Sequence, residues 1–135
     1  MRIGLIAEQA GVNIETIRFY ERKHLIAQPP RPTNGGFRQY PPETIARVRF
    51  IRQAQQLGFS LKEVEELLCL QASPSADCAD VRARASAKLD EVNEKLRGLG
   101  VIRHALEALI QQCPSTGPTA HCSILDALSR AKQGG

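Results

Sequence analysis

The sequence has few aromatic residues and no long apolar run. It contains no Trp, two Tyr and four Phe among 135 residues, so a hydrophobic core would be mostly aliphatic. No apolar stretch approaches the roughly 20 residues that a membrane-spanning helix needs. The first residues, MRIGLIAEQAG, lack the apolar segment of a secretory signal. These absences argue against a membrane or secreted protein and predict a cytoplasmic one.

The sequence also lacks the residue patterns that catalysis requires. It contains no pairing of a nucleophile with a base, no glycine-rich phosphate loop and no carboxylate pair. An enzyme is therefore not expected, and the function should lie in binding.

Charge is unevenly placed along the chain. Residues 1–62 carry 10 Lys and Arg against 4 Asp and Glu, a balance of +6, whereas residues 63–135 carry 8 against 10, a balance of −2. The two sum to the net charge of +4. A basic first half favours a polyanionic partner, although an ordinary solvated surface gives the same balance.

Two short amphipathic helices are expected near the start. Residues 3–10 place their apolar side chains on one face, and Gly11 ends that helix. Asn13 can cap a second helix over residues 14–25. Two helices joined by a short turn that contains Gly are typical of a helix-turn-helix, although many helical hairpins share the pattern.

The second of these helices carries candidate DNA contacts. Thr16, Arg18 and Tyr20 alternate with Ile17, which we expect to be buried. Arg is the commonest reader of guanine edges, and Thr and Tyr commonly bond phosphates. We therefore predict that Thr16, Arg18 and Tyr20 face DNA.

A basic and aromatic hairpin follows the two helices. Three prolines and an Asn-Gly-Gly turn in residues 27–36 predict a loop and a tight turn. Residues 37–40, FRQY, alternate apolar and polar side chains as a short strand does. Such a hairpin after a helix-turn-helix is typical of a wing that grips the DNA backbone, here through Arg38 and Tyr40. A plain hairpin that closes the small core is the alternative.

A second helix pair is expected next. Residues 41–43, PPE, open a helix that ends at residues 57–59. Ser60 with Glu63 forms the capping box of the following helix, whose free amides could hold a phosphate. Cys69 lies among leucines in that helix, and we expect it to be a buried core thiol.

Residues 78–113 contain no proline and predict one long helix. Gly98 and Gly100 inside it indicate either a close approach of two helices or a kink. A lone amphipathic helix needs a partner for its apolar stripe, which is either its own domain or the same helix of a second copy. The spacing alone gives these two alternatives similar weight. The stripe repeats at steps of three and four residues, the period of a coiled coil, through Ala85, Leu89, Val92, Leu96, Leu99, Leu106 and Ile110.

The cysteines constrain the pairing of that helix. Cys78 and Cys113 are 113 − 78 = 35 residues apart, so a continuous helix would hold them roughly 50 Å apart. An antiparallel pair of helices brings Cys78 of one chain beside Cys113 of the other. Cys122 follows Cys113 by 122 − 113 = 9 residues, close enough for both sulfurs to face one ion. Four cysteines in a cytosolic protein favour metal or redox chemistry, and a Cys113–Cys122 redox switch remains an alternative.

The order of these motifs resembles the MerR family of bacterial transcription regulators. The resemblance rests on ETIRFYERKHLI, GGFRQY, RVRFIRQAQQLGFSLKEVEELL and the long helix, and it covers essentially the whole chain. It implies a mainly α fold with a winged helix-turn-helix DNA-binding domain over residues 1–70. It further implies a linker and an antiparallel coiled-coil dimerisation helix over residues 71–112. A metal-binding loop, short helix and tail would occupy residues 113–135.

Within that family, Cys78, Cys113 and Cys122 match the cysteines of the mercury-responsive members in position and in both separations. The resemblance implies one Hg(II) ion held by three thiolates, with Cys78 from one protomer and Cys113 and Cys122 from its partner. Mercuric ion prefers thiolates, and zinc would need a fourth ligand such as His121. Lead and cadmium sensors of the family use similarly placed cysteines and remain competitors.

The resemblance also implies a mechanism. A homodimer would sit on double-stranded promoter DNA, repress without metal, and distort the DNA for bacterial RNA polymerase when metal binds. A zinc-stabilised structural protein with no DNA role is the alternative from another class, and it leaves Arg18, Arg38 and Tyr40 unexplained.

Overall fold

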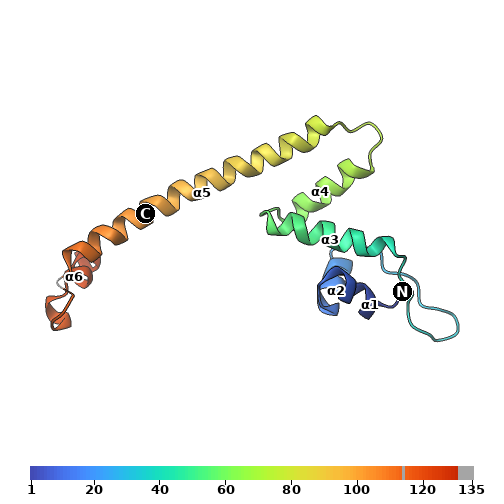
Figure 1. Cartoon of the computed structure of the whole chain (residues 1–135), viewed down its shortest axis with the longest axis horizontal. Coiled ribbons are helices and arrows are strands. Elements are labelled where there is room, and N and C mark those ends of the chain that lie inside the picture. The colour runs from blue at the N-terminus through green and yellow to red at the C-terminus, as the bar shows by residue number, and fades with distance from the viewer. Residues whose placement is uncertain (114, 131–135) are drawn as a thin grey trace. The chain divides into compact units, whose positions relative to one another are not determined.

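The computed structural model describes residues 1–113 and 115–130, which are mainly helical (Figure 1). Among these residues there is no strand, and no helix is long and apolar enough to cross a membrane. One compact unit spans Met1–Ala85, and a second begins at Ser86. The first unit therefore includes the start of the long helix. The elements are α1 (Ile3–Ala10), α2 (Ile14–Arg22), α3 (Glu43–Gln56), α4 (Leu61–Ala72), α5 (Cys78–Gln112), a 3₁₀ turn η1 (Thr119–His121) and α6 (Ser123–Arg130).

The core of the first unit is aliphatic and comes from the apolar faces of α1 to α4. The expected apolar face of α1 is confirmed, and α2, α3 and α4 add their own apolar faces. Five side chains exclude solvent almost completely, and burial of each such side chain contributes about 1.5–3 kcal/mol. They are Ile6, Ile17, Val48, Ile51 and Val64.

The predicted end of α1 and the predicted caps of α2 and α4 are confirmed. Gly11 ends α1 with a φ of 73°, in the left-handed region that glycine adopts without strain. The Asn13 side chain accepts a bond of 2.8 Å from the Thr16 amide at the start of α2. Ser60 and Glu63 form a complete capping box at the start of α4, with bonds of 3.2 and 2.8 Å.

Helix α2 ends at Arg22, so the expected continuation through residue 25 is wrong. His24 has a φ of 61°, and the chain turns there. The Leu25 amide donates 3.0 Å to the Tyr20 carbonyl and stabilises the turn. The turn directs Leu25 and Ile26 into the core, where they are 2% and 6% exposed. Burial of these two apolar side chains outweighs three further residues of helix.

The wing, residues 27–40, contains no strand, so the prediction of a strand at residues 37–40 is wrong. Its turn is closed by the Gly35 amide, which donates 3.2 Å to the Pro32 carbonyl. Tyr40 pairs through its backbone with Met1 in both directions, at 2.6 and 3.0 Å. A single residue pair does not make a ladder, which is why the segment stays irregular.

Three arginines of α3 fix α1 and the turn after α2. All three lie outside the buried face of α3, which comprises Thr44, Val48, Ile51 and Ala54. Each donates to a main-chain carbonyl near the end of a helix, where carbonyls lack helical partners. Three of the positively charged side chains of the first half therefore stabilise the unit itself. The bonds join Arg47 to Leu25 at 3.1 Å, Arg49 to Gln9 at 2.7 Å and Arg52 to Gly11 at 2.6 Å.

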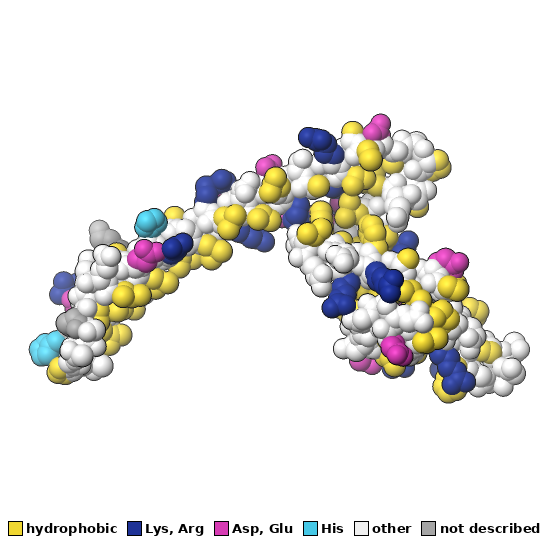
Figure 2. Space-filling model, viewed as in Figure 1, with side chains coloured by type: hydrophobic (Ala, Val, Ile, Leu, Met, Phe, Trp, Pro, Cys, Tyr) yellow, Lys and Arg dark blue, Asp and Glu magenta, His cyan; other side chains and the backbone are white. Residues whose placement is uncertain are grey.

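Helix α5 is continuous over 35 residues. Gly98 and Gly100 do not interrupt it, and a Cβ added at either would meet no described atom within 4 Å. A close approach within this chain therefore does not explain them. Figure 2 shows hydrophobic side chains gathered along one side of the helix. The predicted stripe is exposed at Leu89, Val92, Leu96, Leu99, Leu106 and Ile110.

Candidate functional site

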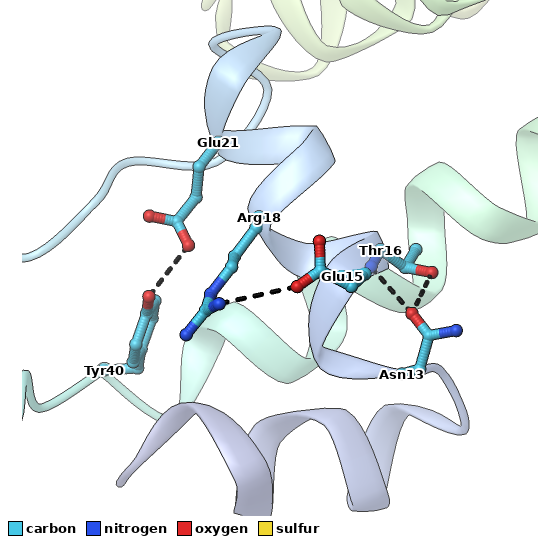
Figure 3. Close-up of polar contacts among 6 residues, drawn as sticks. All are labelled: Asn13, Glu15, Thr16, Arg18, Glu21 and Tyr40. Carbon is cyan, nitrogen blue, oxygen red and sulfur yellow. Dashed lines mark hydrogen bonds and ion pairs between the residues drawn. The ribbon is translucent and has the colours of Figure 1, made fainter.

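The exposed side of α2 presents Arg18, whereas Thr16 is half-buried and lies beside Asn13 at the start of the helix (Figure 3). The Thr16 hydroxyl donates 2.8 Å to the Asn13 side chain and so supports the helix cap. Arg18 lies 3.4 Å from Glu15, and both side chains are exposed. An exposed ion pair of this length contributes little, so Arg18 can exchange Glu15 for another acceptor.

Tyr20 is a core residue, so its predicted exposure toward DNA is wrong. It is 3% exposed, and its hydroxyl donates 2.8 Å to Gln55 on α3. Burial raises the pKa of the Tyr20 hydroxyl, and the charge of Arg52 opposes that rise. Tyr20 follows Ile17 by three residues, so both lie on the same face of the helix.

Tyr40 is also buried, at 4% exposed, and the prediction that it grips the DNA backbone from the surface is wrong. Its hydroxyl donates 2.8 Å to Glu21 on α2 (Figure 3). Burial raises the pKa of Tyr40 to about 12; Glu21 adds to the rise, whereas Arg38 and Arg18 oppose it. Tyr40 therefore fits the alternative hypothesis, in which the hairpin closes the small core.

A basic cavity of about 380 Å³ lies between α2 and the wing. Arg38 is half-buried, and its Nε donates 2.8 Å to the Pro29 carbonyl within the wing. The guanidinium of Arg2 lies 4.2 Å from the centre of the exposed Phe37 ring. Several cations around one hollow suit the closely spaced phosphates of DNA. The arginines that line it are Arg2, Arg18, Arg22 and Arg38.

Sequence reasoning missed Arg2 and Arg22 as members of this basic surface. Arg22 lies one helical turn after Arg18, so the spacing on α2 could have found it. No local signal placed Arg2 beside the wing. At α4, the Ser60 hydroxyl accepts the Glu63 amide, and a phosphate contact by Ser60 remains a prediction.

A short loop joins α5 to α6 and carries two cysteines at its base. Cys113 follows α5, Cys122 precedes α6, and both are half-buried. The Ser123 hydroxyl donates 2.9 Å to the Gln112 carbonyl and so closes the loop. Because these bonded residues directly adjoin the two cysteines, the loop brings Cys113 and Cys122 to the same end.

The third predicted thiol begins α5. Cys78 is exposed, and the preceding Asp77 caps the helix by accepting 2.9 Å from the Ala79 amide. All four cysteines are free thiols. Over residues 1–113 and 115–130 of a single chain, no three His, Cys, Asp or Glu side chains lie together as a metal site.

Cys69 is exposed, so its predicted place in the core is wrong. The buried positions of α4 are Val64 and Leu68. A step of one residue turns about 100° around a helix, which carries Cys69 away from that face. It lies on the surface near Lys62 and Arg84, and Arg84 forms an ion pair with Glu66.

The sequence matches two related family models. The model described as MerR HTH family regulatory protein covers residues 1–70, and the model described as MerR, DNA binding covers residues 45–109. The matches together include the helix-turn-helix, the wing, α3, α4 and most of α5.

Known proteins resemble the chain over nearly its full length. A mercuric resistance operon regulatory protein from Serratia marcescens is 38% identical over 133 residues, which are 98% of this chain and 90% of the relative. The HTH-type transcriptional regulator ZntR from Escherichia coli strain K12 is 36% identical over 135 residues, 98% of this chain and 95% of the relative.

A solved structure resembles the chain as well. The transcription regulator PbrR691 from Ralstonia metallidurans CH34, solved in complex with lead(II), has a TM-score of 0.83 and 31% identity. The match covers 95% of this chain and 98% of that one. Because the family model spans residues 1–70 and the relatives extend through the cysteine loop, this chain belongs to the MerR family of helix-turn-helix regulatory proteins.

Proposed function

We propose that this protein is a mercuric-ion sensor that represses a mercury-resistance operon without metal and activates it when Hg(II) binds. At the coarser level, the chain is a metal-responsive DNA-binding transcription regulator. The observation that carries the finer proposal is the closed loop, which presents two half-buried free thiols at one end. A third free thiol, Cys78, begins α5.

The donor set suits a soft ion. Three thiolates match the preference of Hg(II), and Cys78, Cys113 and Cys122 would hold it. Zinc in a structural site usually takes four ligands, and His121, beside Cys122, is exposed. The mercuric resistance regulator from Serratia marcescens and the lead(II) complex of PbrR691 are both similar to this chain. Lead, cadmium and zinc therefore remain the competing ions.

The site would be shared between two chains. The stripe on α5 is exposed in one chain, and an antiparallel pair of α5 helices would bury it. The same pairing would bring Cys78 of one protomer to Cys113 and Cys122 of its partner. A two-fold axis would generate two such sites in the homodimer.

Metal binding would control transcription through linkage. If Hg(II) prefers one geometry of the dimer, and that geometry prefers distorted promoter DNA, each ligand strengthens the other. The partners would be double-stranded promoter DNA in the cytoplasm and the bacterial RNA polymerase bound to it. Arg18 and Arg38 would contact the DNA from α2 and the wing.

Mixing two inactive variants tests the shared site. Cys78→Ala and Cys113→Ala homodimers should each bind DNA and fail to bind Hg(II) tightly. A heterodimer of the two variants should regain one complete site, because the Cys113→Ala chain supplies Cys78 and the Cys78→Ala chain supplies Cys113 and Cys122. Ultraviolet thiolate absorbance should report one tightly bound Hg(II) per heterodimer.

The mixture would stay inactive if all three ligands came from one chain, and that result with heterodimer formation confirmed would refute the proposal. Cys69→Ala is the matched control, since it removes an exposed thiol outside the site and should leave binding intact. Competition of Hg(II) with Pb(II), Cd(II) and Zn(II) on the native protein tests the choice of metal. Tighter binding of one of the other three would assign the sensor to that ion.

Two further variants test the loop and the redox alternative. Ser123→Ala removes the bond to the Gln112 carbonyl, so it should weaken Hg(II) binding by about 2- to 10-fold, as loss of one hydrogen bond does. A Cys113–Cys122 redox switch needs no Cys78. A Cys78→Ala protein that still released DNA on oxidation would favour that alternative over a metal sensor.

A further inference from the structure

The carboxylate of Glu21 uses only one of its two oxygens. Its Oε1 accepts the Tyr40 hydroxyl at 2.8 Å (Figure 3). Its Oε2 is buried and has no hydrogen-bond partner among the described residues. Most buried polar atoms in proteins are paired, so an unpaired carboxylate oxygen calls for an explanation.

Glu21 lies in the wall of the basic cavity, where it is the acidic residue among four arginines. Each of these arginines has a contact elsewhere. Arg38 bonds the Pro29 carbonyl, and Arg18 pairs with Glu15 at 3.4 Å. The other two lie against aromatic rings, Arg2 over Phe37 at 4.2 Å and Arg22 near Phe19 at 5.9 Å.

Glu21 also connects separate parts of the DNA-binding unit. The residue belongs to α2, and Tyr40 ends the wing. The Tyr40 backbone pairs with Met1 on the other side. One side chain of α2 therefore holds the wing and the start of the chain beside the helix that carries Arg18.

We propose that Glu21 is a positioning residue for DNA binding, which holds Arg18 on α2 and Arg38 on the wing at a fixed spacing for their contacts with DNA. Its bonded oxygen ties the wing to α2 through Tyr40. Its second oxygen supplies the negative charge that offsets repulsion among the arginines. This inference rests on the part of the proposed function that assigns DNA contacts to α2 and the wing, and it does not depend on the metal.

The proposal predicts an effect opposite in sign to simple electrostatics. DNA repels a carboxylate, so removing any negative charge near the DNA-binding face should strengthen binding. If Glu21 positions the arginines, removing its charge should weaken binding instead. Glu21→Gln suits the test because the amide oxygen can still accept the Tyr40 hydroxyl, so the wing keeps its tether while the charge is lost.

The experiment measures the affinity of Glu21→Gln for two duplexes at several salt concentrations. One duplex is selected from a random library by the native protein, and the other is a scrambled version of it. We expect about tenfold weaker binding to the selected duplex, within the range of coupling between residues of one network. The salt dependence should also become shallower by about one for each phosphate that the variant no longer binds.

Glu15→Gln is the matched control. It removes the same charge from the same helix, but Glu15 is exposed and its partner is distant at 3.4 Å. It should bind both duplexes at least as tightly as the native protein. Tyr40→Phe keeps the charge and loses the tether, so it should also weaken binding.

Several outcomes would overturn the inference. These are unchanged or tighter binding by Glu21→Gln, an equal loss in Glu15→Gln, or a loss that vanishes when each variant is measured well below its melting temperature. Native protein that selects no duplex at all would instead refute the proposed DNA contacts. The two failures are therefore distinguishable.

Discussion

Replacing Leu96 with Ala tests whether the α5 stripe is a dimer seam. Leu96 is 59% exposed in the single chain, so more than half of its side chain remains to be buried. Full burial of a Leu contributes about 1.5–3 kcal/mol, and 59% of that is roughly 0.9–1.8 kcal/mol. Two-fold symmetry doubles the figure to about 2–3.5 kcal/mol for the dimer.

Because Ala keeps one of the four side-chain carbons, we expect the dimer to lose about 1.5–2.6 kcal/mol, which raises its dissociation constant roughly 10- to 80-fold. Leu96→Lys should have a larger effect, since it also places a charge in the seam. Sedimentation equilibrium over a dilution series measures the dissociation constant directly. Binding to a duplex with two half-sites should weaken with the dimer.

Val101→Ala is the control for this prediction. Val101 is 71% exposed and lies 101 − 96 = 5 residues along α5, about 140° around the helix from Leu96. It is apolar, exposed and on the same helix, but off the stripe. An unchanged dissociation constant for Leu96→Ala, or an equal rise for Val101→Ala, would show that the seam lies elsewhere.

Three other predictions concern the first unit. In a binding competition, Arg18→Ala should weaken binding to a selected duplex and relax its base preference by about 1–3 kcal/mol, whereas Arg38→Ala should weaken binding to all duplexes alike. If Arg18→Ala binds the selected duplex and random DNA as tightly as the native protein does, Arg18 does not belong to the recognition surface. Tyr20→Phe loses the bond to Gln55, so it should lower the free energy of unfolding by about 0.5–1.5 kcal/mol in urea melts and leave DNA affinity unchanged. A loss of DNA affinity without a loss of stability would show that Tyr20 contacts DNA. The folded pKa of Tyr40 is raised from 10 to about 12, so its contribution to stability is fully present below pH 10 and the free energy of unfolding should fall as pH rises from about 10 to about 12. In melts at several pH values, Tyr40→Phe should show a smaller fall. An equal fall in the variant would contradict the assignment of this effect to Tyr40.

The features that the sequence predicted well are local ones. The start and end of α1, the Asn13 cap and the Ser60–Glu63 capping box each depend on residues within one or two helical turns. Helical periodicity likewise predicted α5 from Cys78 as one unbroken helix. Such signals are visible in a single sequence because the interacting residues are close along the chain.

The features that it missed depend on distant partners. The hydroxyl of Tyr20 bonds a residue 35 positions away, and that of Tyr40 bonds one 19 positions away. The sequence analysis predicted that both tyrosines contact DNA, because a Tyr side chain suits a phosphate contact as well as it suits a buried site with a hydrogen-bond partner. Cys69 was misplaced for another reason, since its leucine neighbours do not reveal which side of α4 faces the core.

The predicted site is likewise only partly local. The spacing of Cys113 and Cys122 indicated a shared end of one loop, and the Ser123 bond to the Gln112 carbonyl is consistent with that arrangement. The membership of Cys78 depends on a second chain, so it stays a prediction. No sequence pattern indicated a role for Glu21, because its buried, unpaired oxygen is seen only in the folded unit, where the wing lies against α2.

The arginines of α3 have a consequence for how the family can diversify. They bind main-chain carbonyls of Gln9, Gly11 and Leu25 rather than side chains. Every residue type provides a main-chain carbonyl, so a substitution at the exposed Gln9 leaves its acceptor in place, whereas Gly11 is constrained by its φ of 73° and by Arg52, and Leu25 by its burial. Evolution can therefore rewrite the outward side chains of α1 and α2, and with them the preferred DNA sequence, while the same anchors continue to hold both helices on α3.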